Sequence, residues 1–235
     1  MMAKPLTWAT VLEEQAEKIP DKEFLYVIYQ DRYITYKEME TNANRMAHYF
    51  MKLGAQPGDG VAVLMGNSPQ FLDVFFGMQK IGMYINTVNT ALRGDGLAYI
   101  IDNSDCRFLV VDYDLVDLFM SVKEKTPQIQ TVIVNTLEAP QDYTVPAGML
   151  DLKDAYESHL PATVPEVDFD ENSIIILMYT SGTTGLPKGV VSRYNKNVVE
   201  RVRPFATLLL KPDSVYFTAL PLFHGNALFL TTTQS

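Results

Sequence analysis

The stretch that decides the fold reads Tyr179-Thr180-Ser181-Gly182-Thr183-Thr184-Gly185-Leu186-Pro187-Lys188-Gly189. It follows the apolar run Ile174 to Met178, so we expect a buried strand that leads into a loop of hydroxyls and glycines ending in one lysine. The three glycines let the backbone adopt positive φ and bring its N–H groups close to an anion. The hydroxyl side chains and the Lys188 ammonium add further donors and a positive charge. This pattern predicts a loop that binds phosphate.

The spacing of this loop excludes two common nucleotide-binding classes. Lys188 follows Pro187 and precedes Gly189, whereas a P-loop reads GxxxxGK[ST]. The chain also lacks the GxGxxG fingerprint of dinucleotide-binding dehydrogenases. An ordinary polar surface loop remains the alternative, but glycines, hydroxyls, proline and lysine directly after an apolar strand favour phosphate binding.

With its flanking residues, YTSGTTGLPKGVV resembles the phosphate-loop signature of the AMP-forming acyl-CoA synthetases, in the adenylate-forming superfamily. Other stretches agree with this resemblance. They are Thr35-Tyr36-Lys37-Glu38 through Gly54-Ala55-Gln56-Pro57-Gly58-Asp59, Val61 to Asn67, Lys80-Ile81-Gly82 to Asn89, and Pro221-Leu222-Phe223-His224. The likeness runs from about Trp8 to the last residue. One departure is that relatives often carry a histidine shortly after GVV, where this chain has Ser192-Arg193-Tyr194.

The resemblance implies a reaction in two steps. A carboxylate attacks the α-phosphorus of ATP to give an acyl-adenylate and pyrophosphate, and the thiol of coenzyme A then displaces AMP. The acid is expected to be a fatty or other acyl acid. The residues implied to grip the β- and γ-phosphates are Thr180, Ser181, Gly182, Thr183, Thr184, Gly185 and Lys188. Mg²⁺ is expected to be held through ATP, with Thr184 nearby, because Mg²⁺ shares phosphate oxygens and keeps bound waters.

The resemblance also places Phe223, His224 and Gly225 at the acyl pocket. Amino-acid-activating relatives carry an aspartate after this phenylalanine to hold the α-ammonium of the substrate. This chain has His224 at that position, which favours an acid without an amino group. A non-catalytic nucleotide-binding module and an aryl-acid or amino-acid adenylating relative stay open as alternatives.

Composition limits the partners and the compartment. The chain has 235 residues, 47% of them hydrophobic, and a formal net charge of -9, so nucleic acid is not an expected partner. Cys106 is the single cysteine, which excludes an internal disulfide and suits a reducing compartment. No apolar run approaches the ~20 residues of a membrane span. We expect a cytoplasmic protein; peripheral membrane contact and a homodimer stay open.

The order of patterns predicts an α/β fold with layered parallel sheets flanked by helices, the N-terminal portion of the large domain of an adenylate-forming enzyme. Helices are predicted at Tyr36 to Phe50, Gln70 to Lys80, Gly96 to Asp102, Leu115 to Lys125 and Asn195 to Leu209. Strands are predicted at Val61 to Met65, Tyr84 to Val88, Phe108 to Val111, Thr131 to Val134 and Ser214 to Ala219. Thr35 with Glu38 predicts a capping box, and Ser68-Pro69 predicts a helix start.

Proline and acidic residues between Leu137 and Asp170 predict a surface excursion with one short helix, Leu152 to Ser158. A second sheet is expected to begin at Ser173. The expected division is therefore a first α/β subdomain over residues 1–170 and the start of a second over residues 171–235.

The apolar segment from Ala227 to Leu230 has no closing signal before Ser235. We therefore expect a truncated domain that is inactive on its own, with no catalytic residue in this part of the enzyme. By resemblance, the catalytic lysine, the ribose-binding aspartate and the acidic Mg²⁺ ligand would lie beyond Ser235.

Overall fold

A seven-stranded sheet forms the centre of the protein in a computed structural model that describes residues 6–157, 159–180, 186–194, 199, 211 and 214–232. Its spatial order is β7-β6-β5-β3-β4-β8-β9, and every neighbouring pair is parallel except β8 and β9. The strands are β3 (Gly60–Leu64), β4 (Tyr84–Thr87), β5 (Phe108–Asp112), β6 (Thr131–Asn135), β7 (Leu150–Asp151), β8 (Ile174–Thr180) and β9 (Lys188–Arg193).

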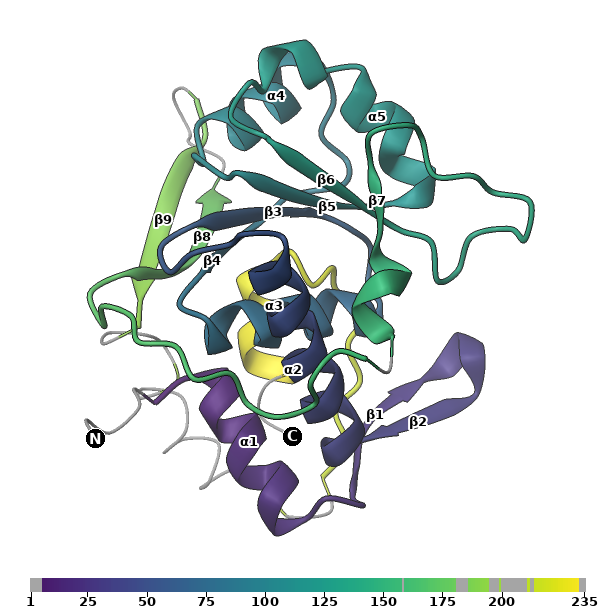
Figure 1. The fold of residues 1–235 in the computed structure, drawn as a ribbon, viewed down its shortest axis with the longest axis vertical. Coiled ribbons are helices and arrows are strands. Elements are labelled where there is room, and N and C mark those ends of the chain that lie inside the picture. Colours follow the sequence, from purple (N-terminus) through teal and green to yellow (C-terminus); the bar gives the residue numbers. More distant parts are fainter. Residues whose placement is uncertain are drawn as a thin grey trace.

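Helices cover both faces of this sheet, as the sequence predicted (Figure 1). On one face, α2 (Tyr36–Lys52) and α3 (Pro69–Lys80) pack against the sheet, and α1 (Trp8–Lys18) packs against these two helices. The other packs against α4 (Gly94–Asp102) and α5 (Val116–Met120). Strand β3 is buried along its whole length, because alternate side chains enter the two hydrophobic layers.

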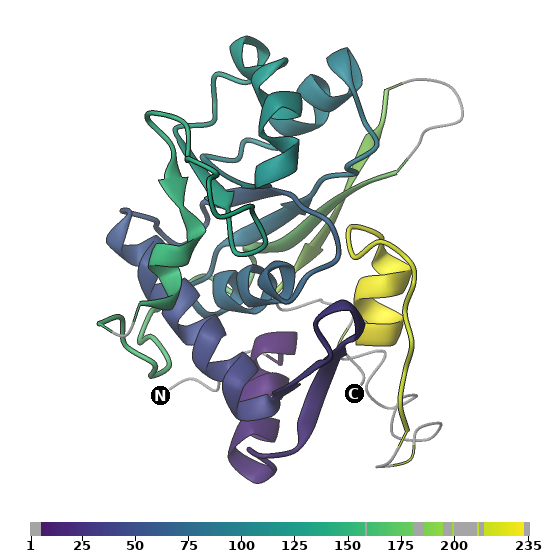
Figure 2. The same cartoon turned by 90° about the vertical axis from the view of Figure 1, so that its right-hand side faces the viewer.

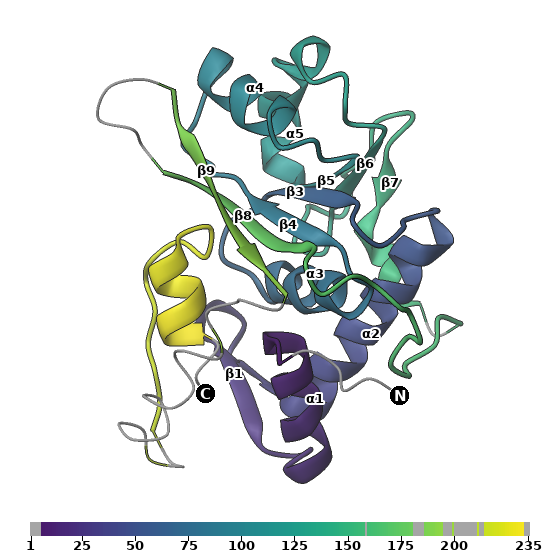
Figure 3. The ribbon, with the colours of Figure 1, turned by 90° about the vertical axis from the view of Figure 1, so that its left-hand side faces the viewer.

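The chain near its C-terminus joins the first of these layers. The segment Asn226–Thr232 forms a π-helical turn, drawn in yellow in Figures 2 and 3, beside the purple N-terminal elements. Ala227 and Leu228 are fully buried there. The ring of Phe229 stacks on Trp8 of α1, with ring centroids 4.8 Å apart. Segments more than 200 positions apart in sequence therefore share one core.

Local signals place the central helices correctly. The Thr35 hydroxyl accepts a hydrogen bond from the Glu38 amide at the start of α2, as predicted, but the Glu38 carboxylate contacts the Arg32 guanidinium instead of completing a capping box. Ser68 caps α3 and Pro69 is its first residue. Gly82 ends that helix with φ of +69°, and a Cβ there would lie 2.5 Å from Phe169, so glycine is required.

Several expectations need correction. A second sheet does not begin at Ser173, because β8 pairs with β4 and extends the central sheet; the subdomain division at residue 170 stays a prediction. The helix expected from Leu115 to Lys125 is only α5, flanked by 3₁₀ turns at Tyr113–Leu115 and Lys123–Lys125. The short helix of the excursion is a 3₁₀ turn, Leu152–Tyr156. The strand expected at Ser214 to Ala219 has no regular structure. The helix expected at Asn195 to Leu209 lies outside the described residues, apart from Val199.

The helix and the two strands that precede α2 were not predicted from the sequence. These are α1 and the antiparallel hairpin of β1 (Glu23–Val27) and β2 (Arg32–Thr35). The only feature predicted in this region was Thr35, which caps α2. Strands β7 and β9, which lie at the two edges of the sheet, were also not predicted. Strand β9 follows the predicted phosphate loop directly, so this loop connects two antiparallel strands.

A buried carboxylate lies between α3 and the surface excursion. Asp73 of α3 is 1% exposed and accepts a hydrogen bond of 2.7 Å from the Tyr156 hydroxyl. Burial raises the pKa of Asp73 to about 7, and the hydrogen bond from Tyr156 offsets only part of that increase. The hydrogen bond from Tyr156 thus connects the excursion to a carboxylate on α3 whose ionised form is destabilised by burial.

This raised pKa makes the free energy of unfolding depend on pH. Below about pH 4 Asp73 is protonated in both states, and between about pH 4 and pH 7 only the unfolded state ionises, so stability falls as pH rises through that window. We expect Asp73→Asn to raise the free energy of unfolding by about 2 kcal/mol at pH 8 and to change it little at pH 4. Urea unfolding at both pH values measures this, with the exposed Asp142→Asn as control. Equal gains at pH 4 and pH 8 would contradict it.

Candidate functional site

The candidate site lies at the edge of the sheet where parallel strands end. Strands β3, β4 and β8 run in the same direction and end at Leu64, Thr87 and Thr180, so their carboxyl ends share this edge. Ligands of open α/β sheets bind in the crevice outside the carboxyl ends of the strands. The predicted phosphate loop begins at this edge, immediately after β8.

The ends of that loop are brought together by the β8–β9 hairpin. Thr180 and Lys188 face each other across the antiparallel pair, and both are exposed. The predicted phosphate ligands Ser181, Gly182, Thr183, Thr184 and Gly185 lie outside the described residues. The hairpin therefore places the exposed Thr180 hydroxyl and the exposed Lys188 ammonium at the base of the loop that connects β8 and β9.

Gly189 does not have the positive φ that the sequence reading expected of it. It lies within β9 opposite Tyr179, and its φ is outside the positive range. A Cβ at this position would lie 2.8 Å from the Leu177 side chain and 3.5 Å from the Tyr179 ring. A side chain here would require the end of the Leu177 side chain to move, so glycine allows close packing across the hairpin.

Tyr179 fixes the end of β8. Its hydroxyl donates a hydrogen bond of 2.9 Å to the Asn103 side chain, and its ring packs edge-on against Tyr99 of α4, with centroids 6.3 Å apart. Burial raises the pKa of this hydroxyl to about 12, so it stays a donor at neutral pH. These contacts hold the strand residue that precedes the loop, and the sequence reading assigned them no role.

The predicted acyl-pocket residues lie at the same edge of the sheet. The Thr87 hydroxyl, at the end of β4, donates a hydrogen bond of 3.0 Å to the Phe223 carbonyl. Phe223 is half-buried and His224 is exposed, with ring centroids 4.7 Å apart. A Cβ on Gly225 would lie 3.3 Å from the Phe229 ring and 3.6 Å from the Met178 sulfur of β8. The segment with Phe223 therefore packs beside the strand that carries Thr180.

Leu222 and Ala227, the apolar neighbours of these residues, have a structural role. Leu222 is 5% exposed and Ala227 is fully buried, both within the core formed with α1, α2 and α3. They anchor the segment on either side of Phe223 and Gly225. The apolar character of the local sequence thus comes largely from core residues.

Tyr194 directly follows β9. It is fully buried, and its hydroxyl donates a hydrogen bond of 2.7 Å to the Met83 carbonyl. Its ring packs against Phe169 of the excursion, with centroids 4.6 Å apart. This side chain anchors the end of β9 to the core.

Asp112, at the end of β5, supports the same edge and was not predicted. Its carboxylate accepts hydrogen bonds from the Gly66 amide at 2.7 Å and from the Asn135 side chain at 2.8 Å. Burial raises the pKa of Asp112 to about 6, although both hydrogen bonds lower it. The carboxylate fixes the turn that follows β3.

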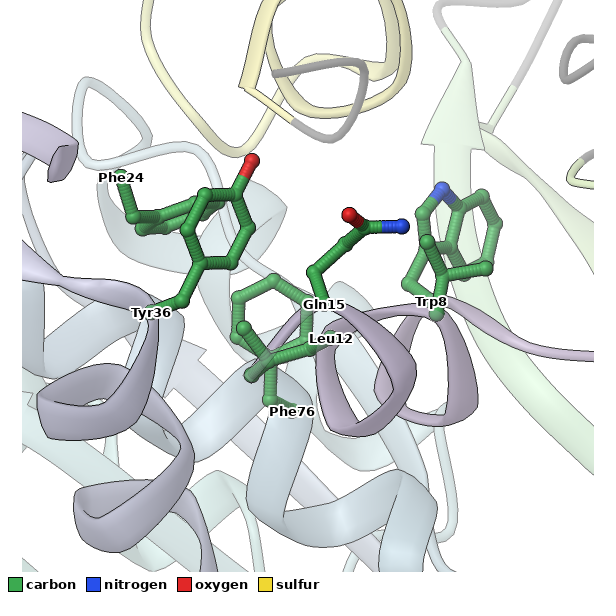
Figure 4. Close-up of a pocket in the computed structure, with 7 residues that line it drawn as sticks. Trp8, Leu12, Gln15, Phe24, Tyr36 and Phe76 are labelled. Carbon is green, nitrogen blue, oxygen red and sulfur yellow. The ribbon is translucent and has the colours of Figure 1, made fainter. Parts of the chain in front are cut away.

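A hollow beside α1 is too small to hold an acyl substrate. Figure 4 shows its lining, and its volume is about 20 Å³. The lining residues are Trp8, Val11, Leu12, Gln15, Phe24, Tyr36 and Phe76. Drug-sized ligands occupy several hundred cubic ångströms, and a single water needs roughly 10–15 Å³. The hollow has room for about one water molecule.

Two kinds of feature are missing from the part of the chain that the structure describes. No helix there combines the length and the apolar character needed to cross a bilayer. The same residues include no group of three or more His, Cys, Asp and Glu side chains that could hold a metal ion.

Comparisons with known proteins agree with this architecture. The sequence model of the family described as AMP-binding enzyme matches residues 12–233. A medium/long-chain-fatty-acid–CoA/3-oxocholest-4-en-26-oate–CoA ligase of Mycobacterium tuberculosis is 34% identical over 195 residues, 82% of this chain and 34% of that protein. 4-Hydroxybutyrate–CoA ligase 2 of Metallosphaera sedula is 31% identical over 227 residues, 94% of this chain and 40% of that protein.

A solved structure shows the same fold. The crystal structure of the anthranilate CoA ligase AuaEII in complex with anthranoyl-AMP superposes with a TM-score of 0.84 at 22% identity, over 99% of this chain and 44% of that one. The chain thus spans between a third and a half of the length of these relatives. Since the family model matches nearly the whole sequence, the chain belongs to the AMP-binding enzyme family.

Proposed function

We propose that the protein containing this chain activates a carboxylic acid with ATP and transfers it to coenzyme A. A carboxylate oxygen attacks the α-phosphorus. The bond between the α-phosphorus and the oxygen that bridges it to the β-phosphorus breaks, and pyrophosphate leaves. The thiol sulfur then attacks the acyl carbonyl, the carbon–oxygen bond to AMP breaks, and the thiol proton is released. The product is an acyl-CoA thioester.

One observation carries this proposal. The Thr180–Lys188 hairpin and the Phe223–Gly225 segment meet at the carboxyl edge of the sheet, with Gly225 next to Met178 of β8. The reaction joins a phosphate-bearing and an acyl-bearing substrate at one atom, so the two binding elements must be adjacent. Positioning and charge stabilisation supply most of the rate of such transfers.

In this proposal the loop between β8 and β9 binds the β- and γ-phosphates of ATP. The assigned residues are Thr180, Ser181, Gly182, Thr183, Thr184, Gly185 and Lys188. In this proposal the exposed Lys188 ammonium neutralises charge that moves onto the leaving pyrophosphate. Mg²⁺ would be held through the phosphates of ATP, with Thr184 nearby in this proposal, and would supply charge neutralisation, since it prefers phosphate oxygens and water to a full protein cage.

The acid in this proposal is hydrophobic and lacks an amino group. Phe223 offers an apolar ring, and His224 supplies no carboxylate to pair with an α-ammonium. An unpaired ammonium buried there would cost several kcal/mol, whereas each buried methylene contributes about 0.8 kcal/mol. The name of the Mycobacterium tuberculosis ligase cites medium- and long-chain fatty acids and supports this substrate class, whereas the 4-hydroxybutyrate in the name of the Metallosphaera sedula ligase is a short polar acid that also lacks an amino group.

A substrate panel tests the proposal. The full-length protein is given ATP, Mg²⁺ and coenzyme A with fatty, aryl or amino acids, and thioesters are detected by mass spectrometry. We expect thioesters of hydrophobic acids without an amino group. Preferential activation of amino acids would move the protein to the peptide-synthetase branch. Binding of ATP without any activation would support a non-catalytic nucleotide-binding module.

A further inference from the structure

The side-chain amide of Asn67 holds the backbone just before the predicted acyl-pocket residues. Its Nδ2 donates a hydrogen bond of 2.9 Å to the Leu220 carbonyl, and its Oδ1 accepts one of 2.7 Å from the Leu222 amide. Both ends of one rigid amide are therefore bonded to backbone groups on either side of Pro221. Such a paired contact fixes the orientation of the segment as well as its distance from the sheet.

A second contact extends this attachment by one residue. The Thr87 hydroxyl donates to the Phe223 carbonyl at 3.0 Å, so side chains at the ends of β3 and β4 hold the backbone from Leu220 to Phe223. Asp112 accepts from the Gly66 amide and so sets the turn that presents Asn67. We call Asn67, Thr87 and Asp112 the edge clamp.

The segment needs such an attachment because the chain before it has little other support. Residues 214–219 form no helix or strand. Val215 and Phe217 are 93% and 73% exposed. Only at Leu222 does a side chain of this stretch enter the core. The position of Phe223 relative to the strand edge is therefore set by the packing of Leu222 and Ala227 on either side of it and by the edge clamp.

We propose that Asn67 is a positioning residue that determines which acids the protein activates, an inference that rests on the proposed function. It acts through the backbone of Leu220 and Leu222, which carries Phe223 and His224 into place, and it does not itself touch the acid. Loss of the Asn67 side-chain amide lets the segment from Leu220 to His224 shift. The apparent affinity for the acid therefore falls, while ATP binding at the β8–β9 loop is unaffected.

The first test measures the clamp without any activity. Hydrogen exchange of the Leu222 amide is followed in the full-length protein by mass spectrometry with fragmentation of the peptides. Asn67→Ala removes the acceptor and is expected to accelerate this exchange at least tenfold, whereas Asn67→Asp keeps an acceptor and retains most of the protection. Gln130→Ala, at an exposed amide before β6, is the control and leaves exchange at Leu222 unchanged. Unchanged exchange in Asn67→Ala would overturn the clamp.

The second test measures specificity in the full-length protein. We expect Asn67→Ala to lower kcat/KM for the best acid by about tenfold, mainly through KM for the acid, with KM for ATP unchanged and the ranking of acids altered. Asn67→Asp should fall between Asn67→Ala and the wild type. An equal loss for every acid, or a parallel rise in KM for ATP, would overturn the positioning role. A wild type that activates no acid refutes the proposed function, and the exchange experiment still decides the clamp.

Discussion

Replacing Lys188 with alanine in the full-length protein is expected to lower acid-dependent exchange of pyrophosphate into ATP by about 100-fold. The lysine lies opposite Thr180 at the base of the predicted phosphate loop, and its side chain is exposed. Because the exposed side chain contributes little to packing, the fold should stay intact, as circular dichroism and the melting temperature would record. Thr184→Ala is expected to act in the same direction, on the sequence pattern alone.

The control for this prediction is a lysine of similar exposure away from the strand edge. Lys123→Ala changes the exposed first residue of the turn after α5 and should leave exchange at the wild-type rate. If Lys188→Ala or Thr184→Ala exchanged pyrophosphate as fast as the wild type, the assignment of that residue to the phosphates would be wrong. If both exchange and the melting temperature fell, the loss would be one of folding.

Replacing Lys80 with methionine is expected to lower the free energy of unfolding by about 3 kcal/mol at pH 8. The Lys80 ammonium lies 2.7 Å from the Glu40 carboxylate, and their side chains are only 2% and 12% exposed. This ion pair joins α3 to α2. Methionine keeps the apolar stem but leaves a buried carboxylate unpaired, which is costly in a medium of low dielectric.

The pH dependence of this loss separates a charge effect from a packing effect. Burial raises the pKa of Glu40 and Lys80 lowers it, so the pKa rises further without the lysine. A pKa raised above that of the unfolded state makes the native state bind a proton more readily as the pH falls, so the deficit in stability should shrink from pH 8 to pH 5. The double variant Glu40→Gln with Lys80→Met should recover most of the loss at pH 8. A deficit that is equal at both pH values would contradict the ion-pair explanation.

Local signals were enough to place the elements that end in caps and glycines. Helix α3 begins at Ser68-Pro69 and stops before Gly82, as predicted, because cap chemistry acts over three or four residues. The strands β3 to β6 were found because buried parallel strands read as continuous apolar runs. The hairpin of β1 and β2 was missed because four aromatic or aliphatic side chains of this region, Tyr26, Ile28, Tyr29 and Tyr33, are exposed, so no buried face was visible in the sequence.

Contacts between distant segments could not be predicted from local patterns. Thr87 and Phe223 are 136 positions apart, and Asn67 and Leu222 are 155 apart, so only the fold reveals their hydrogen bonds. The role of Gly189 was misread for the same reason, because the Leu177 side chain that packs closely against it belongs to the neighbouring strand. The proposed binding residues rest on the sequence pattern, and the structure identified the residues that hold the flanking segments in place.

The most direct test of the proposed activity omits coenzyme A. The full-length protein is incubated with ATP, Mg²⁺ and a hydrophobic carboxylic acid, and the products are separated and identified by mass spectrometry. The account predicts an acyl-adenylate and pyrophosphate in equal amounts, with no ADP, and formation of the thioester and AMP when coenzyme A is then added. Formation of ADP and phosphate, or a thioester without any preceding adenylate, would contradict it.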